Sequence, residues 1–359
     1  MKRLLFAMLL VAGTALSLFG QAQEPFKLGA FEERGQVFLG LVLRDSLVVH
    51  IAQANAALAG AKPAIPADMK ELIVRYDALR PRLYAIANAA GAASATRPAY
   101  VRDVKAVKIL PPVMPAIMAN AAVNYAAHGA EMSAGSGSVV GLPPQEAEKV
   151  LKGIPGAWDR KPGDTRQNPY LFLKSPLTII AEGEAIRIPP GRSSVDWECE
   201  LNAVISKTAN HVPVERAAEY IFGWTLQNDV SDRGGRADGR LGTDWFLMKN
   251  HDTFAPLGPF IIPREFVKDP MKLSQKFLLS GKVMQDANTD QMIHNVYEML
   301  SYASSVMTLR PGDLISMGSP AGVGAGRAEP IYMKNGDVSV CTIEGIGTLT
   351  NPVVGPGAR

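Results

Sequence analysis

The sequence predicts a mixed, β-rich α+β protein in which a small N-terminal domain precedes a larger domain. From Leu177 onward, short β-branched runs alternate with turns, and few segments show helical periodicity. The 359 residues include 33 glycines and 26 prolines, which is typical of a chain with many turns and short strands. Many short strands with few helices favour a rolled, mixed β-sheet core.

The first 22 residues have the three parts of a secretory signal peptide. They are a positive start at residues 2–3, an apolar stretch at residues 4–19, and small side chains at Gly20 and Ala22. An uncleaved membrane anchor is the alternative, but the apolar stretch is short for a membrane span. We therefore expect a periplasmic or secreted protein that begins near Gln23 and has no membrane association after cleavage.

Residues 23–105 are expected to form the small N-terminal domain, and residues 106–355 the larger domain. Short apolar runs between glycines and charged residues indicate strands, and an alanine-rich segment with helical periodicity indicates a helix. The expected elements are strands at Lys27–Phe31 and Gln36–Val42 and a helix that includes Met69–Tyr76. The proline-rich segment Pro111–Pro115 marks the passage into the larger domain.

The segment 125–170 is expected to form a lid or an insertion in the larger domain. Residues 133–168 are rich in Gly, Ser, Pro and charge, and long loops of this kind are often lids or binding loops. A neutral surface loop remains the alternative. The clearest helices of the larger domain are expected at Val214–Ile221 and Met292–Met307, the second with an apolar stripe at helical spacing.

Three carboxylates are the main candidates for a functional site. Glu198 and Glu200 lie two apart in an apolar run, so a strand would present both on one face, and Asp229 follows another apolar run. Carboxylates buried together need a positive charge between them. An all-oxygen set suits Mg²⁺ or Mn²⁺, and Ca²⁺ would also fit. The alternative is an exposed edge strand with solvated glutamates.

The two cysteines, Cys199 and Cys341, both lie in strand patterns. Cys199 lies between the two glutamates, so its side chain points to the opposite face of that strand, as a small buried hydrophobe would. An oxidising compartment would permit a disulfide between the two cysteines, but we do not expect one. No histidine stands at ligand spacing from either cysteine, so a zinc site is not expected.

Charge and composition exclude some classes of partner. The formal net charge is +3, and two of the positive charges lie in the predicted signal peptide. No Lys/Arg cluster or stripe of basic and aromatic residues is present, so nucleic acid is not an expected partner. With 47% hydrophobic residues, the chain can bury a core of the size that an enzyme needs.

Six motifs in order give the chain a resemblance to the fumarylacetoacetate hydrolase family, over residues 105–355. The motifs are Asn124–Met132, Phe172–Lys174, Glu198–Leu201, Asn228–Ser231 with Arg233 close behind, Lys249–Pro259 and Gly318–Gly324. The resemblance implies a β-roll catalytic domain and a Mg²⁺- or Mn²⁺-dependent enzyme that acts on acylpyruvate-like 1,3-dicarbonyls or related 2-oxo acids. It also implies a homodimer.

The resemblance implies a role for each matching residue. Glu198, Glu200 and Asp229 match the metal ligands of the family. His128 and Glu131, three apart on one helical turn, match a His–Glu dyad on a mobile lid that activates water. A surface His–Glu pair is the alternative.

The remaining matches are expected to bind substrate. Lys249 matches a lysine beside the metal, where its cation would hold a substrate oxygen or an oxyanion. Lys174 and Thr253 match weaker positions. Gly318, Ser319 and the glycines that follow would offer backbone N–H groups and a hydroxyl to a substrate carboxylate.

Arg236 departs from the family pattern, which often has glutamine seven residues after the metal aspartate. The arginine would either clamp a second substrate carboxylate or extend into solvent. Three functional hypotheses therefore compete. They are a metal-dependent hydrolase of C–C bonds in acylpyruvate-type acids, an isomerase or decarboxylase of 2-hydroxy-dienoates or 2-oxo acids on the same site, and a non-catalytic periplasmic binding protein.

Overall fold

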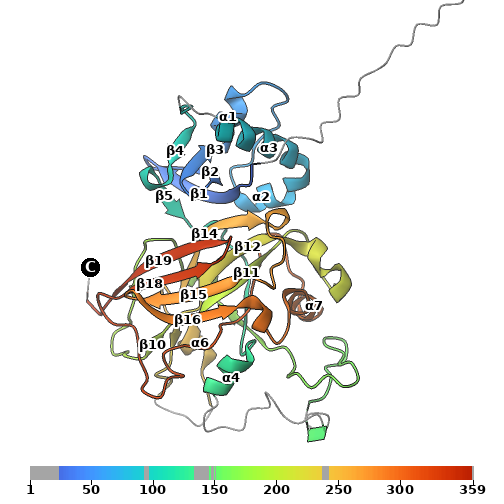
Figure 1. Cartoon of the computed structure of the whole chain (residues 1–359), viewed down its shortest axis with the longest axis vertical. Coiled ribbons are helices and arrows are strands. Elements are labelled where there is room, and N and C mark those ends of the chain that lie inside the picture. Colours follow the sequence, from blue (N-terminus) through green and yellow to red (C-terminus); the bar gives the residue numbers. More distant parts are fainter. Residues whose placement is uncertain are drawn as a thin grey trace, which may run out of the picture.

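A computed structural model describes residues 24–92, 97–132, 151–236 and 242–357, together with residues 145, 146 and 149 (Figure 1). The predicted signal peptide and part of the predicted insertion lie outside the described residues. Within these ranges, no helix has the length and hydropathy that a membrane span requires. The described fold is mixed and rich in sheet, as predicted.

The N-terminal region is a small antiparallel sheet covered by helices, drawn in blue and cyan in Figure 1. Its elements are β1 (Lys27–Glu33), β2 (Gln36–Leu43), β3 (Leu47–His50), β4 (Val101–Asp103), α1 (Ile51–Ala57), α2 (Met69–Val74), α3 (Tyr76–Ala92) and the short 3₁₀ helix η1 (Val104–Ala106). The Asp68 side chain caps α2 by accepting from two backbone N–H groups. Apolar side chains such as Leu41, Leu72 and Leu83 fill the space between sheet and helices. Both predicted strands are confirmed, whereas the helix predicted to include Met69–Tyr76 is divided at Arg75 into α2 and the start of α3.

The N-terminal sheet continues into the larger domain without a break. β1 pairs with β14 (Ala255–Pro263), and β5 (Lys108–Leu110) pairs back onto β1. The sheet of the N-terminal region thus extends past residue 105, where we expected the domain boundary, to Leu110.

The central strands bring distant parts of the chain together. After β14 the sheet runs through β12 (Ile221–Asn228), β11 (Cys199–Ile205), β17 (Leu314–Ser316), β6 (Met118–Ala121) and β7 (Leu171–Lys174), and β8 (Ile179–Ile180) pairs with β14. β11 and β12 are antiparallel and wholly buried, with Glu200 opposite Gln227. The C-terminal end of β12 therefore lies beside the N-terminal end of β11.

A second sheet covers one face of these strands. It consists of β16 (Lys282–Asn288), β15 (Ser274–Leu279), β18 (Val338–Ile343), β19 (Gly347–Val354) and β9 (Ile186–Arg187), while β10 (Val195–Asp196) pairs with β13 (Ser231–Asp232). Trp197 stacks on Phe277 with ring centroids 5.4 Å apart, inside the core between the sheets.

Cys199 and Cys341 form a disulfide, so our expectation of two unpaired cysteines was wrong. β18 packs against β11 and β12, and the two Cα atoms lie 5.5 Å apart, within the range of a disulfide. The sequence shows that both residues are in strands, but it does not show that these strands face each other across the two sheets.

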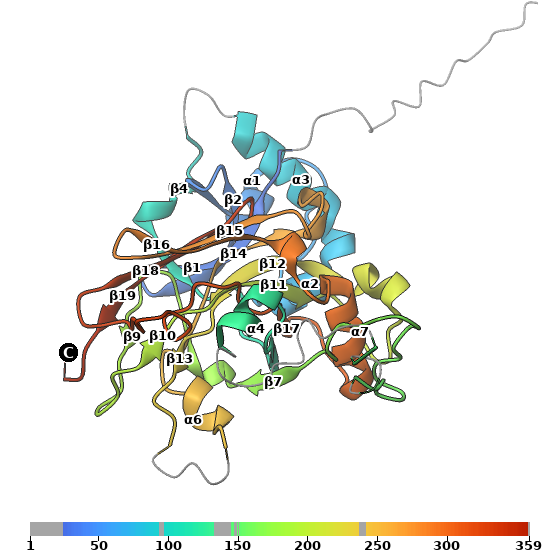
Figure 2. The same ribbon diagram turned by 60° about the horizontal axis from the view of Figure 1, so that its bottom comes forward.

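The helices of the larger domain differ from our predictions at their ends. They are α4 (Ala126–Met132), α6 (Trp245–Lys249) and α7 (Val296–Val306), with 3₁₀ helices η2 (Pro176–Thr178), η3 (Val214–Tyr220), η4 (Arg264–Phe266) and η5 (Thr289–Gln291). The predicted helix at Met292–Met307 starts later because Asn295 and Glu298 form a capping box there. The predicted helix at Val214–Ile221 is a 3₁₀ helix. Figure 2 shows α4, α6 and β7 gathered on the side of the sheet away from the N-terminal region.

The described part of the insertion, residues 151–168, is docked against α7. Arg166 forms ion pairs with Asp164 and Glu298, each at 2.9 Å, and the Trp158 ring lies 4.9 Å from the His294 ring. Gln167 Nε2 donates to the carbonyl of Val123, just before α4. Residues 151–168 are therefore held against α7 and against the segment just before α4.

Candidate active site

The three predicted metal ligands meet at the adjoining ends of β11 and β12. Oxygen atoms of Glu198, Glu200 and Asp229 lie within 4.8 Å of one another, and all three side chains are buried. The strand ends are fixed by hydrogen bonds from Asp229 N to Glu198 O (2.7 Å) and from Glu198 N to Asn228 Oδ1 (2.8 Å). The predicted convergence of these carboxylates is thus present in the structure.

Two lysine amines hold the carboxylates in place. Lys249 Nζ lies 2.6 Å from both Glu198 Oε2 and Asp229 Oδ2, and burial tends to lower the pKa of Lys249, but the two carboxylates outweigh it and raise the pKa. Lys174 Nζ donates to Asp229 Oδ1 (2.6 Å) and to the carbonyl of Val230. Burial lowers the pKa of Lys174 to about 8, although Asp229 opposes the shift.

Lys174 lies behind Asp229 and does not line the cavity described below. Its amine is fully buried and reaches only the carboxylate and a backbone carbonyl. Lys174, which we expected to bind substrate, is therefore placed to act through Asp229.

Of the three carboxylates, Glu200 has its charge least compensated by neighbouring groups. Ser316 donates to its Oε2, but its buried Oε1 has no hydrogen-bond partner. Burial and the neighbouring Asp229 and Glu198 raise the pKa of Glu200 well above its ordinary value. For Glu198, burial also tends to raise the pKa, but Lys249 and the other nearby cations outweigh it and the pKa is lowered. An unpartnered oxygen in an all-carboxylate set fits a hard divalent cation such as Mg²⁺ or Mn²⁺.

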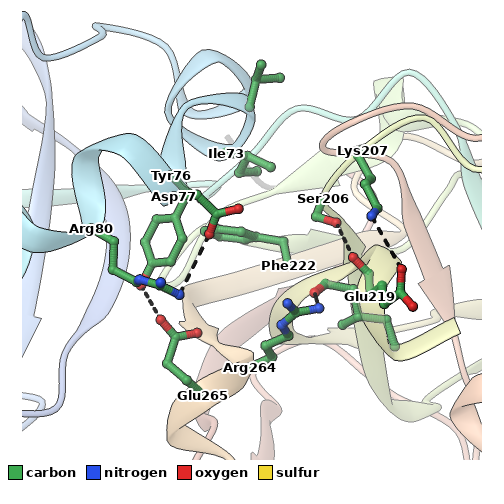
Figure 3. Close-up of a pocket in the computed structure, with 12 residues that line it drawn as sticks. Ile73, Tyr76, Asp77, Arg80, Ser206, Lys207, Glu219, Phe222, Arg264 and Glu265 are labelled. Carbon is green, nitrogen blue, oxygen red and sulfur yellow. Dashed lines mark hydrogen bonds and ion pairs between the residues drawn. The ribbon is translucent and has the colours of Figure 1, made fainter. Parts of the chain in front are cut away.

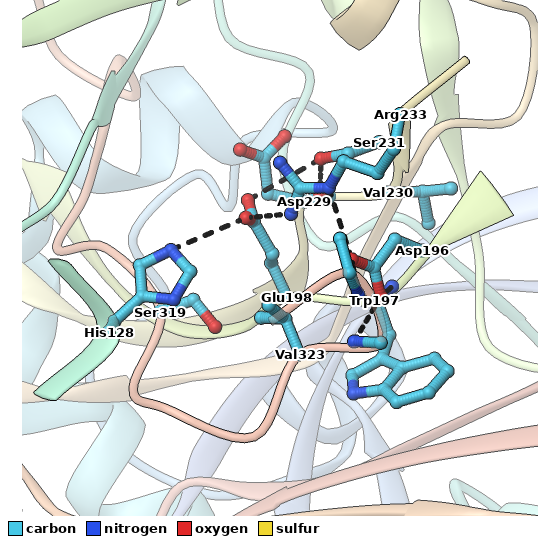
Figure 4. Close-up of polar contacts among 12 residues, drawn as sticks. His128, Asp196, Trp197, Glu198, Asp229, Val230, Ser231, Arg233, Ser319 and Val323 are labelled. Atoms are coloured by element: carbon cyan, nitrogen blue, oxygen red, sulfur yellow. Dashed lines mark hydrogen bonds and ion pairs between the residues drawn. The ribbon is translucent and has the colours of Figure 1, made fainter. Parts of the chain in front are cut away.

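The predicted His–Glu dyad is formed on α4 and faces the carboxylates. His128 Nδ1 lies 2.8 Å from Glu131 Oε1. The other ring nitrogen, Nε2, lies 3.7 Å from Glu198 Oε1 (Figure 4). The His128 side chain is buried. The carboxylate at Nδ1 favours the tautomer that carries the proton there, which leaves Nε2 free to accept a proton.

The glycine-rich loop holds side chains of the protein instead of offering all its N–H groups to a ligand. Gly322 N donates to Glu131 Oε2 at 2.9 Å, and Gly324 N donates to Asp196 Oδ1 at 2.7 Å. A Cβ at Gly322 would lie 2.1 Å from the carbonyl oxygen of Met284, so only glycine fits there. Our expectation that these N–H groups bind a substrate carboxylate is thus wrong for Gly322 and Gly324.

Of the first two residues of this loop, one reaches the cavity described below and the other packs beside the start of α4. Ser319 lines the cavity, and its hydroxyl accepts from Gln285 Nε2 at 2.8 Å. Gly318 has a φ of 87° and packs against Asn124 at the entrance to α4.

Asp196 is a site residue that the sequence reasoning missed. Its buried carboxylate accepts from Gly324 N and Ala325 N and pairs with Arg233 Nε at 3.0 Å, and Arg233 in turn pairs with Glu198 (Figure 4). Asp196 lies two residues before Glu198, so the same alternation that singled out Glu198 and Glu200 could have found it.

The polar contacts form a closed ring that joins α4 to Glu198, one of the three predicted metal ligands. In order, the ring consists of Asp196, Arg233, Glu198, His128, Glu131 and the Gly322–Gly324 backbone. A shift at any member would therefore change the distance between the dyad and the carboxylates.

Arg236 and Thr253 are not brought to the site. Arg236 Nη1 lies 3.7 Å from Asp244 Oδ2, and Arg236 does not line the cavity. Thr253 has a φ of 72°, and its hydroxyl accepts from Arg187 N at 2.8 Å, in contact with β9. Neither residue therefore lines the cavity described below.

A cavity of about 190 Å³ opens onto the carboxylates. It is lined by Ala121, Ala122, Val123, His128, Met132, Phe172, Glu198, Glu200, Arg233, Thr243, Trp245, Met248, Lys249 and Ser319. Lys249 Nζ lies 5.0 Å from the centre of the Phe172 ring, so the charged and apolar parts of the wall adjoin.

A larger cavity, of about 380 Å³, lies between α2–α3 and the 3₁₀ helices of the larger domain (Figure 3). Tyr76 donates to Glu265 at 2.6 Å, and Lys207 pairs with Glu219 at 3.7 Å. None of the predicted site residues lines this cavity. Arg264 donates to backbone carbonyls, and the other charged groups contact side chains of the protein, so we assign this cavity no role in the chemistry.

The buried acidic triad, the His–Glu dyad and the rolled mixed sheet are together typical of a metal-dependent enzyme. Residues 118–354 match the family model described as "Fumarylacetoacetate (FAA) hydrolase C-terminal". The chain therefore belongs to the fumarylacetoacetate hydrolase family.

Relatives in this family have different named activities. The chain is 37% identical over 188 residues to an oxaloacetate tautomerase of Xenopus laevis, a match that covers 52% of this chain and only 59% of that relative. A 5-carboxymethyl-2-hydroxymuconate delta-isomerase structure from Mycobacterium smegmatis has a TM-score of 0.63 and 28% identity, and covers 92% of this chain and 100% of that one. A maleylpyruvate hydrolase from Sphingobium sp. SYK-6, in complex with manganese(II) and pyruvate, has a TM-score of 0.64 and 26% identity, with 92% and 99% covered.

Proposed function

We propose that this protein is a metal-dependent hydrolase that cleaves a carbon–carbon bond in acylpyruvate-type 2,4-dioxo acids. The observation that carries the proposal is the position of the dyad: His128 Nε2 faces the carboxylates at 3.7 Å, and Glu131 occupies the other ring nitrogen. Hydrolysis needs a base for water at this position. A protein that only binds its ligand has no need of one.

The chain's own residues supply the base and its orientation. His128 Nε2 accepts a proton from water, and Glu131 stabilises the imidazolium through Nδ1–H. The Gly322 N–H fixes Glu131 in turn. A bound Mg²⁺ or Mn²⁺, held by Glu198, Glu200 and Asp229, would supply Lewis-acid stabilisation of the enolate that leaves when the bond breaks.

Lys249 is proposed to contact substrate directly. Its amine lines the cavity, and two of its three N–H groups are directed to Glu198 and Asp229. The third can donate to a substrate oxygen on which negative charge develops. Lys174 keeps Asp229 in position from behind.

An isomerase or tautomerase is the second candidate, and the names of two relatives favour it. Such a reaction moves a proton between carbon and oxygen, and His128 would serve as its base without any attack by water. Enolate stabilisation is common to both reactions, so the carboxylates do not separate them.

Product analysis separates the two candidates. The chelated protein would be resupplied with Mg²⁺ or Mn²⁺ and given a panel of 2,4-dioxo acids and 2-oxo acids. A hydrolase releases pyruvate and a second carboxylic acid in equal amounts, whereas an isomerase leaves the carbon skeleton intact. Isomerisation without any release of pyruvate would reject the hydrolase, and no turnover with any compound or metal would reject both candidates.

We also propose that the protein is exported and dimeric. The Cys199–Cys341 disulfide is compatible with the oxidising compartment that the predicted signal peptide implies. Leu173, Leu177 and Phe246 are large, exposed apolar side chains near the edge strand β7 and on α6, and a second copy of the chain would cover them. N-terminal sequencing of native protein and its mass in solution test the two proposals. An intact Met1 in a membrane fraction would overturn the first, and a monomer the second.

A further inference from the structure

The cavity has two chemically different halves. One half contains Glu198, Glu200, His128 and Lys249, and the other is formed by apolar side chains from three separate elements. The apolar residues are Met132 on α4, Phe172 on β7, and Trp245 and Met248 on α6. A substrate whose diketo acid end lies at the carboxylates must place its remaining atoms against this second half.

Aromatic rings give the apolar half a defined surface. The Phe172 and Trp245 rings lie 4.8 Å apart at a tilt of 37°, and Tyr170 meets Trp245 edge-on at 5.6 Å. Phe172 also borders Lys249, so the rings extend from the catalytic amine outward. Rings arranged in this way favour contact with a flat or branched hydrocarbon group.

Each cationic side chain on the described part of the cavity wall already contacts two carboxylates. Arg233 contacts Asp196 and Glu198, and Lys249 contacts Glu198 and Asp229. In residues 24–92, 97–132, 151–236 and 242–357, no further Lys or Arg lines the cavity. Arg236, for which the sequence left open a clamp on a second carboxylate or an extension into solvent, lies beside Asp244.

We infer that the substrate has an apolar substituent, aryl or branched alkyl, beyond the diketo acid, and no second carboxylate. The inference rests on the proposed function, because it takes the diketo acid end to lie at the metal ligands. It separates this chain from relatives named for substrates that have more than one carboxylate, such as the maleylpyruvate hydrolase and the carboxymethyl-hydroxymuconate isomerase.

The physical reason is the difference in desolvation between the two kinds of substituent. A carboxylate against Trp245 and Met248 would lose water without gaining a cation, which is strongly unfavourable. A phenyl or isobutyl group at the same place gains the burial of its apolar surface. Apolar pockets discriminate by roughly 10- to 200-fold per group, and an unpaired charge adds to this.

A matched set of substrates tests the inference. The set consists of 2,4-dioxo-4-phenylbutanoate, its para-carboxylate and its para-carboxamide, which has nearly the same size as the carboxylate without its charge. We expect kcat/KM for the carboxylate to be lower by roughly tenfold or more, and the carboxamide to stay close to the phenyl compound. A carboxylate that reacts as fast as the phenyl compound would overturn the inference and leave the proposed function intact.

Variants assign the preference to this wall. Met132→Arg places a cation at the rim, and it should raise the reactivity of the carboxylate relative to the phenyl compound, whereas Met132→Gln should not. Trp245→Ala should lower kcat/KM for the phenyl compound. Val306→Ala is the control, because Val306 is also an exposed apolar side chain but lies on α7 and does not line the cavity.

Binding measurements keep the inference testable if the proposed function fails. Calorimetry on the Mn²⁺-loaded protein would compare 2-oxo-4-phenylbutanoate with its para-carboxylate, neither of which can undergo the cleavage. Tighter binding of the phenyl compound supports the inference even if no dioxo acid is hydrolysed. Equal binding, or no binding of either compound, overturns it.

Discussion

The two faces of β11 are equally buried but have opposite chemistry. On one face, Cys199, Leu201 and Ala203 pack into the core against the second sheet. On the other face, Glu200 and Asn202 point into a polar interior, where an oxygen of Glu200 has no hydrogen-bond partner. Burial alone therefore does not distinguish a stabilising side chain from a functional one. The first face contributes to folding, while the second tolerates an unfavourable arrangement that a metal ion would relieve.

The largest effect is expected on the polar face. Glu200→Gln should abolish both divalent metal binding and turnover, because one of three ligands loses its charge. Metal analysis and assays on the folded variant would measure this. If the variant retained its metal, the proposed metal site would be rejected.

The same variant should not harm the metal-free fold. The pKa of Glu200 is raised above its ordinary 4.5 in the folded protein, so above that pH the unfolded chain releases a proton that the folded protein keeps, and folding becomes less favourable as the pH rises. In the presence of chelator, Glu200→Gln should therefore be at least as stable as the wild type, with an advantage that increases from pH 5 to pH 8. Denaturant titration at the two pH values measures it, and a variant less stable at pH 8 would contradict the assignment.

The second effect separates the base from the metal site. His128→Ala should lower turnover by about a hundred- to ten-thousand-fold, which is typical for a positioned general base. Affinity for oxalate, a ligand expected to meet the metal and not the dyad, should barely change. Glu131→Gln should lose less, because the imidazole remains. Near-normal hydrolysis by His128→Ala would reject the dyad, whereas a retained proton exchange would show that the site still forms the enolate.

Alternation along one strand predicted much of the site. It predicted that Glu198 and Glu200 share one face and that Cys199 lies on the opposite face. The structure confirms this placement. The same rule, extended by two residues, would have found Asp196. The alternation gives the face of a side chain but not its partner, which comes from another sheet, so the disulfide was missed.

Motif position was a weaker guide than strand geometry. Thr253 lies in the same motif as Lys249, yet its left-handed backbone conformation directs the hydroxyl to Arg187 N. The glycine-rich loop was expected to bind a ligand, and its N–H groups bind Glu131 and Asp196. Such contacts depend on three-dimensional neighbours, which a single sequence does not give.

The third effect belongs to the apolar face. The disulfide closes a loop with a sequence separation of 142 residues. Replacing both cysteines with alanine should lower the free energy of unfolding by about 2–4 kcal/mol. Turnover and metal affinity should be retained at low temperature, since neither side chain reaches the cavity. Denaturant unfolding with a parallel assay measures both, and lost metal affinity in a folded double variant would show that the two faces are coupled.

The smallest effect tests the ring of polar contacts that joins α4 to Glu198. Asp196→Asn removes the charge that holds Arg233 and weakens the bonds from Gly324 and Ala325. Hydrogen bonds to a charged group are worth about 1.5–3 kcal/mol. A partial loss of the contacts that orient the His128–Glu131 dyad should therefore lower kcat by about tenfold. KM and oxalate affinity should change little, because the ligands themselves remain.

Asp232→Asn is the matched control for this prediction. Asp232 is also fully buried and lies on β13, which pairs with the strand of Asp196, but its partners are Arg192 and His251, outside the ring. If Asp196 only supports the fold, both variants should lose stability and neither should show a selective loss of kcat. If Asp196 positions the dyad through Arg233 and the glycine-rich loop, kcat should fall in Asp196→Asn alone, and its pH profile should shift. Equal kcat losses in the two variants would show that the ring supports the fold and does not position the dyad.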